Sequence, residues 1–327
     1  IIGGGGKKVN HLATICLKNF KICEDGSIFV VIQFEKSKEM LKSFNYLLAN
    51  FWKIRYNSPC IWETQMIDRD GIERPDKFDQ HMRPISNDTR KIKFDDKYSY
   101  RPRNIFFRMW ASFFRALVIC VLNPIFHFKY KMKVYGKKNM KKLRKKGFII
   151  ACNHCFLFDD LGIGVNVFPF RKVYFGALDR SMRRPLVGFY LRSLGGIPIP
   201  SSSLSGMKKF NEDVGYLLKK NKPVIIDPEG SLWPYYRDIR PFKRGAFSLA
   251  VKNDVPVLPM VLTFKRKQKK NGKFKYKVYY TACEPVYANS EISEERKRIE
   301  DVLNRTRQIM IDTADEFYKS QDCGFEN

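Results

Sequence analysis

The chain has 327 residues, 44% of them hydrophobic, and its 27 Phe and 16 Tyr exclude an intrinsically disordered protein. Its 61 Lys and Arg outnumber 33 Asp and Glu, which gives a formal net charge of +28. Such a surface attracts anions, so the candidate partners are nucleic acid, an anionic membrane face, or acidic and phosphorylated substrates.

The N-terminal region, residues 1–98, carries no recognisable chemistry and could be a non-native extension. Within it, residues 27–34 predict a strand, and 36–55 predict a helix because their apolar residues fall on one stripe. Residues 68–100 are polar and punctuated by prolines, which is typical of a linker. Residues 1–20 lack the apolar core and cleavage site of a secretory signal, so none is expected.

Residues 99–146 form the second expected region, and 105–128 are the most apolar segment of the chain. Arg108 and Arg115 interrupt its first half, and Asn123 with Pro124 is expected to break the second, which leaves no run long enough to span a membrane. With the basic flanks, including 137–146, this pattern predicts one or two amphipathic helices lying on an anionic membrane surface. A buried helix pair with a basic rim is the open alternative.

The third region, residues 147–327, alternates between strand and helix patterns, which predicts an α/β fold with a mixed, mostly parallel sheet flanked by helices. The amphipathic membrane-associating segment precedes this sheet. The expected strands are 147–152, 172–178, 223–227, 255–262 and 274–283, and the expected helices are 207–220, 245–253 and 292–319.

Residues 151–160, ACNHCFLFDD, allow three chemistries. Cys152 and Cys155 form a C-x-x-C pair that could act in redox chemistry or, with His154, bind a metal. The other cysteines are scattered, so a zinc site lacks its second ligand pair, and we expect a reducing, cytosol-facing compartment without a disulfide framework. The third chemistry is a base, His154, with a carboxylate partner, Asp159.

The five-residue spacing of His154 and Asp159 constrains where each residue lies. On one continuous helix the two side chains would point about 140° apart. They can meet if His154 lies in the turn after a strand ending at Cys152 and Asp159 lies in the first helical turn. Asn153, at that junction, is expected to cap the helix. These ten residues alone leave the three chemistries open.

Further blocks follow in order along the chain. The motif N-H-x-x-x-x-D at 153–159 is followed by LGGIPIPS at 194–201, PEGS at 228–231 and VPVLP at 255–259. In this order and spacing, residues 104–290 resemble the lysophosphatidate (1-acylglycerol-3-phosphate) acyltransferase family of membrane glycerolipid acyltransferases. The resemblance favours the acid–base interpretation over the metal and redox ones.

The resemblance implies an O-acyltransferase of phospholipid biosynthesis, with His154 as general base and Asp159 orienting it. Acyl-CoA or acyl carrier protein would donate the acyl group to a lysolipid acceptor, with lysophosphatidate the first candidate, and no cofactor or metal is expected. The enzyme would lie on the cytoplasmic face of the cell membrane as a peripheral or monotopic protein. The expected substrate-binding residues are Glu229, Gly230, Ser231, Lys243, Arg244 and Gly245.

Three positions depart from the family pattern and bear on the acceptor. Pro200 and Ser201 replace an Asp-Arg pair, and Leu232 replaces an arginine. In the family these arginines are associated with the acceptor phosphate, so a glycolipid or other non-phosphate acceptor is an open alternative. Nearby basic residues that could substitute are Lys208, Lys209, Arg237, Arg240, Lys243 and Arg244.

Two further alternatives concern the nucleophile and the partner. Cys155 lies beside His154 and could act as a nucleophile, although a packing role in the first helical turn is favoured. A nucleic-acid-binding protein is the rival class on charge alone. The chain has no recognisable nucleic-acid-binding motif, so no nucleic-acid partner is expected.

Overall fold

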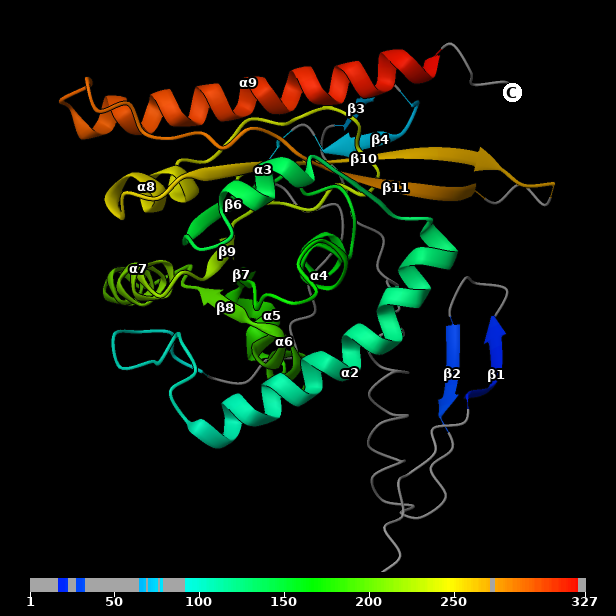
Figure 1. The fold of residues 1–327 in the computed structure, drawn as a ribbon, viewed down its shortest axis with the longest axis horizontal. Coiled ribbons are helices and arrows are strands. Elements are labelled where there is room, and N and C mark those ends of the chain that lie inside the picture. Colours follow the sequence, from blue (N-terminus) through cyan, green and yellow to red (C-terminus); the bar gives the residue numbers. More distant parts are fainter. Residues whose placement is uncertain are drawn as a thin grey trace, which may run out of the picture. The chain divides into compact units, whose positions relative to one another are not determined.

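The computed structural model describes residues 17–22, 28–32, 65–68, 70–75, 77–78, 92–270 and 274–322. The chain divides into two compact units, Ile1–Pro59 and Cys60–Asn327. In the first unit, β1 (Leu17–Ile22) and β2 (Ile28–Ile32) pair as an antiparallel hairpin (Figure 1). β2 confirms most of the strand predicted at 27–34, while the helix predicted at 36–55 lies outside the described residues.

The second unit contains the remaining described elements. Its strands are β3 (Gln65–Ile67), β4 (Glu73–Pro75), β5 (Lys133–Tyr135), β6 (Phe148–Cys152), β7 (Tyr174–Leu178), β8 (Gly196–Ile199), β9 (Pro223–Ile225), β10 (Val257–Gln268) and β11 (Phe274–Ala282). Its helices are α2 (Ile105–Tyr130), α3 (Lys137–Lys142), α4 (Asp159–Gly162), the π-helix η1 (Ile163–Val167), α5 (Asp179–Arg183), α6 (Pro185–Leu194), α7 (Leu204–Lys219), α8 (Gly245–Lys252) and α9 (Glu295–Asp322).

The segment expected to be a linker contributes to the second unit. β3 and β4 form an antiparallel hairpin in which the buried Arg74 pairs with Asp68 at 2.7 Å. Phe94 and Tyr100, further along the same segment, are buried in a core of this unit. Because these side chains pack there, the boundary between compact units falls after residue 59, whereas the sequence suggested residue 98.

The central sheet has seven strands in the order β5-β11-β10-β6-β9-β7-β8. Within this sheet every neighbouring pair is parallel except β10 and β11, which form a long antiparallel ribbon. The predicted α/β class with a mixed, mostly parallel sheet is confirmed. The order places β6 between β10 and β9, so the loops after β6 and β9 emerge side by side at the carboxyl edge, where α/β proteins place their functional groups.

Helices cover both faces of this sheet, as predicted (Figure 1). β6 is buried along its whole length, and its residues alternate between two cores because successive side chains of a strand point to opposite faces. Ile149 and Ala151 join the core formed with α7, α8 and α9, whereas Ile150 and Cys152 join the core formed with α2 and η1. The loop after β6 is thus anchored from both sides.

The apolar segment forms one continuous helix, α2, so the predicted break at Asn123 and Pro124 is wrong. The helix passes through Pro124 because the following turn is held by packing, with Phe126 buried against the unit. Arg115, which also counted against a long apolar element, turns back onto the unit and donates to backbone carbonyls, including that of Arg171 at 2.8 Å. With 26 residues and a mean hydropathy of 1.9, α2 is long and apolar enough to cross a membrane by length and composition.

Candidate active site

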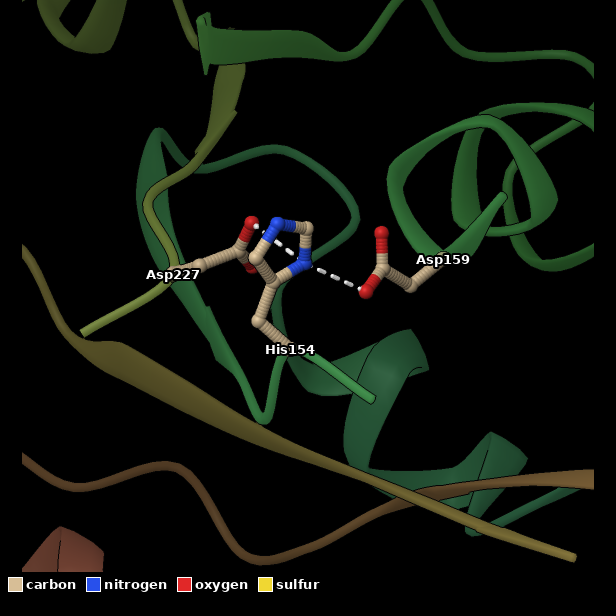
Figure 2. Close-up of side chains that lie close together, drawn as sticks. All are labelled: His154, Asp159 and Asp227. Atoms are coloured by element: carbon tan, nitrogen blue, oxygen red, sulfur yellow. Dashed lines mark hydrogen bonds and ion pairs between the residues drawn. The ribbon is translucent and has the colours of Figure 1, made fainter. Parts of the chain in front are cut away.

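His154 and Asp159 meet at the carboxyl edge of the sheet (Figure 2). His154 lies in the loop after β6, and Asp159 is the first residue of α4. Nδ1 of His154 lies 2.6 Å from Oδ2 of Asp159, which is hydrogen-bond distance. The structure therefore brings this pair together in the way that its strand–turn–helix spacing predicts.

Asn153 fixes the start of the loop, but not as the predicted helix cap. Its Oδ1 accepts a hydrogen bond of 2.7 Å from the backbone N–H of Leu262, and its Nδ2 donates to the carbonyl of Leu262 at 2.9 Å. α4 begins after Phe158, too far along the chain for Asn153 to cap it. The buried amide instead joins the loop to the backbone of β10, and this satisfies both its donor and its acceptor.

Glu229 holds the loop from the other side. Its Oε2 accepts a hydrogen bond of 3.0 Å from the backbone N–H of His154. The same carboxylate forms a buried ion pair with Arg240, 2.5 Å between Nη2 and Oε2, and Oε1 accepts from the backbone N–H of Arg240 at 3.0 Å. Glu229 thus ties the loop after β9 to the loop after β6. Its predicted contact with a substrate stays a prediction.

Gly230 and Ser231 continue this turn. Gly230 has φ +74°, a conformation that glycine adopts without strain, and Lys243 lies directly over it: a Cβ at Gly230 would come within 3.0 Å of Lys243 Nζ. Ser231 is buried, donates to the carbonyl of Phe78 at 2.7 Å and accepts from Arg240 at 2.5 Å. In this group the side chain of Lys243 is exposed, while that of Ser231 is engaged internally.

Arg244 and Gly245 lie at the start of α8. Arg244 is exposed and turns toward α9, where it pairs with Glu300 at 3.4 Å. Gly245 is the exposed first residue of α8. Neither has a described contact with His154, so the structure does not gather these two predicted substrate-binding residues into the same cluster as Lys243.

Several of the basic residues proposed to replace the missing arginines are engaged elsewhere. Arg240 is buried against Glu229, and Arg237 makes two hydrogen bonds of 2.9 and 2.7 Å to Asp70. Lys209 pairs with Glu212 at 3.1 Å on α7. Lys243, over Gly230, is the member of the predicted set whose exposed side chain lies on the Pro-Glu-Gly turn.

The imidazole of His154 lies in a strongly negative environment. Burial opposes its charged form, but the negative charges of Asp159, Asp227 and Glu229 and the hydrogen bond to Asp159 outweigh burial and raise the pKa of His154 to about 9. Asp227, which no motif in the sequence singled out, places Oδ2 3.5 Å from Nδ1 of His154. Its signal in the sequence was its position just after β9, two residues before Glu229.

Donor atoms of His154, Asp159 and Asp227 lie within 4.8 Å of one another, a spacing that a single cation could bridge. In the observed arrangement, however, Nδ1 of His154 faces the carboxylate of Asp159 at hydrogen-bond distance and Asp227 approaches the same nitrogen. These groups therefore form a connected network that can hold and transfer a proton, as acid–base chemistry requires.

The two cysteines beside this network pack as apolar residues. Cys152 and Cys155 are buried free thiols in the core formed with α2 and η1. Burial raises the pKa of the Cys155 thiol well above its ordinary value, and the carboxylates of Asp159 and Glu229 raise it further. A thiol that resists ionisation is a poor nucleophile, which supports the predicted packing role.

The fold and site define an α/β domain with a histidine–carboxylate pair at the carboxyl edge of a mostly parallel sheet. Residues 131–263 match the protein-family model described as Acyltransferase. This range contains His154, Asp159 and the Pro-Glu-Gly turn.

Named relatives come from several organisms. The chain is 28% identical over 144 residues to a 1-acyl-sn-glycerol-3-phosphate acyltransferase of Bacillus subtilis, a match that covers 42% of this chain and 65% of that protein. It is 28% identical over 196 residues to a protein of the same name from Saccharomyces cerevisiae, covering 57% and 60% of the two chains. The chain therefore spans less than two thirds of the length of these curated relatives.

Among solved structures, the chain is similar to the 1-acyl-sn-glycerophosphate (LPA) acyltransferase PlsC from Thermotoga maritima. The two share 24% identity with a TM-score of 0.44, over 63% of this chain and 83% of that one.

Proposed function

We propose that this protein is an O-acyltransferase of glycerolipid synthesis that moves a fatty acyl group from a thioester donor to the hydroxyl of a lysophospholipid-type acceptor. The observation that carries the proposal is the 2.6 Å contact between His154 and Asp159 inside the region that matches the acyltransferase family. The names of the relatives support lysophosphatidate as the first acceptor to test.

In the proposed mechanism His154 is the general base. Asp159 holds Nδ1, which leaves Nε2 to take the proton from the acceptor hydroxyl as its oxygen attacks the thioester carbonyl. The tetrahedral intermediate then collapses, the carbon–sulfur bond breaks, and the departing thiolate receives the proton from the imidazolium. No cofactor enters this sequence. The donor, acyl-CoA or acyl carrier protein, is a co-substrate.

The protonation state of His154 sets the pH dependence of this mechanism. A pKa of about 9 means that most imidazole rings carry a proton at neutral pH. Since only the neutral ring can act as the base, kcat should rise as the pH increases from neutral to about 9. General-base assistance of this kind contributes about 10²–10⁴-fold to a rate.

The acceptor site is proposed to lie beside the Pro-Glu-Gly turn, with the exposed Lys243, which lies over Gly230, as its cation. A lysine is a single point charge and does not reproduce the paired hydrogen bonds of an arginine to a phosphate. With Leu232 in the position of a family arginine, a non-phosphate or glycolipid acceptor is therefore the second candidate to test.

We also propose that α2 lies against the cytoplasmic, anionic face of a membrane. Large apolar side chains of its first half are exposed, among them Phe106 at 77% and Phe113 at 65%. Phe189 of α6 contacts Phe107 and Trp110, which extends this apolar surface onto the catalytic unit. Apolar area next to a strongly basic chain is what holds a peripheral protein at an anionic bilayer.

The test is acyl transfer by purified protein in detergent with labelled acyl-CoA or acyl-carrier-protein donors. The acceptor panel holds lysophosphatidate, glycerol 3-phosphate, other lysolipids and glycolipids, with His154→Ala as the comparison. Product from lysophosphatidate that disappears in His154→Ala supports the full proposal. If product forms only from another acceptor, that acceptor replaces lysophosphatidate in the proposal. If product still forms in His154→Ala, His154 is not the general base.

A further inference from the structure

Asp227 reaches His154 because of strand order. β9 lies beside β6 in the sheet, so the residues that follow both strands emerge at the same edge. Asp227 follows β9 by two residues and places Oδ2 3.5 Å from Nδ1 of His154. Figure 2 shows the carboxyl groups of Asp159 and Asp227 on either side of the imidazole ring. One ring nitrogen thus faces two carboxyl groups.

Asp227 is poorly satisfied in this position. Its Oδ1 is buried and has no hydrogen-bond partner in the described part of the chain, and the same holds for Oδ1 of Asp160 on α4. Burying a carboxylate oxygen without a hydrogen-bond partner costs free energy, so such a group tends to keep its proton or to bind a hydrogen-bond donor. Burial raises the pKa of both carboxyl groups well above the ordinary value; Asp160 raises the pKa of Asp227 further, and Asp159 raises the pKa of Asp160.

The surroundings of His154 and Asp227 are mostly acidic. Arg240, a cation close to them, is bound to Glu229 and also donates to the carbonyl of His154 at 3.3 Å. The described titratable and charged groups that face His154 or Asp227 are Asp159 and Asp160 of α4, Cys152 of β6, and Cys155, Glu229 and Arg240 of the loops. Tyr280 of β11 donates to the carbonyl of Asp159 at 3.3 Å.

Resting on the proposed function, we propose that Asp227 is a positioning residue of the reaction: a second carboxyl partner of His154 whose charge decides how readily the imidazole is free to take a proton. When Asp227 is ionised, it holds the imidazolium. When Asp227 keeps its proton, it no longer stabilises the imidazolium, and His154 becomes neutral at a lower pH. Asp160 favours the second state, because two buried carboxyl groups that raise each other's cost of ionisation do not readily carry a negative charge at the same time.

Two substitutions of equal charge change separate these roles. Asp227→Asn removes a negative charge beside the ring and keeps the shape of the side chain. Asp160→Asn removes a negative charge from the same cluster but leaves Asp227 free to ionise. Because Asp227 lies 3.5 Å from Nδ1 of His154, its substitution should act directly on the imidazole, whereas the loss of Asp160 should act through Asp227.

The measurement is an NMR titration of the full chain carrying isotope-labelled histidine, without substrate. The chain has four histidines, and His154→Ala identifies the His154 signal. We expect a midpoint near 9 in the unchanged protein. Asp227→Asn should lower it by about one pH unit, the lower end of what a nearby charge produces. Asp160→Asn should leave it unchanged or raise it.

An unchanged His154 midpoint in Asp227→Asn would overturn the proposal, as would an equal downward shift in both variants. If the protein transfers acyl groups, the rising limb of kcat against pH should move down by the same amount in Asp227→Asn, with KM little changed. The titration needs no turnover. If the protein transfers no acyl groups, the proposed function is therefore excluded. The titration still decides whether Asp227 affects the pKa of His154.

Discussion

Removing the carboxylate of Glu229 should both destabilise the protein and release His154. Three donors converge on this group: Nη2 of Arg240 at 2.5 Å and the backbone N–H groups of Arg240 and His154, each at 3.0 Å. Both charged side chains of the pair are 1% exposed. In Glu229→Ala the guanidinium would stay buried without its counter-charge, while two backbone donors would lose their acceptor.

Breaking a buried ion pair in this way costs about 3–5 kcal/mol. Arg240 keeps other acceptors, including Ser231 Oγ at 2.5 Å and the carbonyl of Phe78 at 3.0 Å, so we expect the lower end, about 3 kcal/mol. With a urea m-value of about 3 kcal/mol/M, the unfolding midpoint falls by about 1 M. Tryptophan fluorescence reports this transition because Trp233 is fully buried beside Arg240.

Glu300→Ala is the matched control, since the same residue type is removed from a half-exposed pair with Arg244 on the surface. Its cost should stay below about 1 kcal/mol. Acyl transfer should fall in Glu229→Ala under conditions where the variant is still folded, because the backbone of His154 loses its anchor. Equal unfolding midpoints for the two variants would refute this account of how the His154 loop is held.

Three further predictions follow from the site and from α2. Cys155→Ala should keep kcat within about twofold in the acyl-transfer assay, because a thiol of raised pKa is a poor nucleophile; a tenfold loss would contradict its packing role. Phe106→Glu with Phe113→Glu should weaken sedimentation with anionic vesicles about tenfold, and Phe274→Glu, an exposed position on β11, should not. Folded His154 binds a proton that the unfolded chain releases near pH 6.5, so unfolding free energy should fall by up to about 3 kcal/mol between pH 6.5 and 9, and this slope should flatten in His154→Ala.

The sequence was informative where local pattern and chemistry coincide. The buried strand FIIAC, the amphipathic pattern of α7 and the long closing helix α9 were predictable because each has a strong period and a clear end. The His154–Asp159 contact was predictable for the same reason, since a strand followed by a turn and a helix brings residues of this spacing together. The strand before His154 and the helix that begins at Asp159 lie close together in the sequence.

The rest of the site depends on contacts between distant segments. Asp227 reaches His154 only through the order of β6 and β9 in the sheet, which no local pattern reveals. Arg240 appeared to be a candidate for a substrate phosphate, yet it pairs with Glu229 because the chain folds back over the Pro-Glu-Gly turn. The break expected at Pro124 failed likewise, since tertiary packing can carry a helix through a proline.

The pair of hydrogen bonds between Asn153 and Leu262 has a consequence for how this site can change over generations. Asn153 binds the main chain of β10, so its two hydrogen bonds do not depend on which side chain residue 262 carries. Position 262 can exchange one apolar residue for another of similar volume while the histidine loop keeps its anchor. Asn153 has no such freedom, because no other side chain of that length offers one donor and one acceptor to the same peptide unit. Mutational tolerance should therefore differ sharply between the two partners of a single contact.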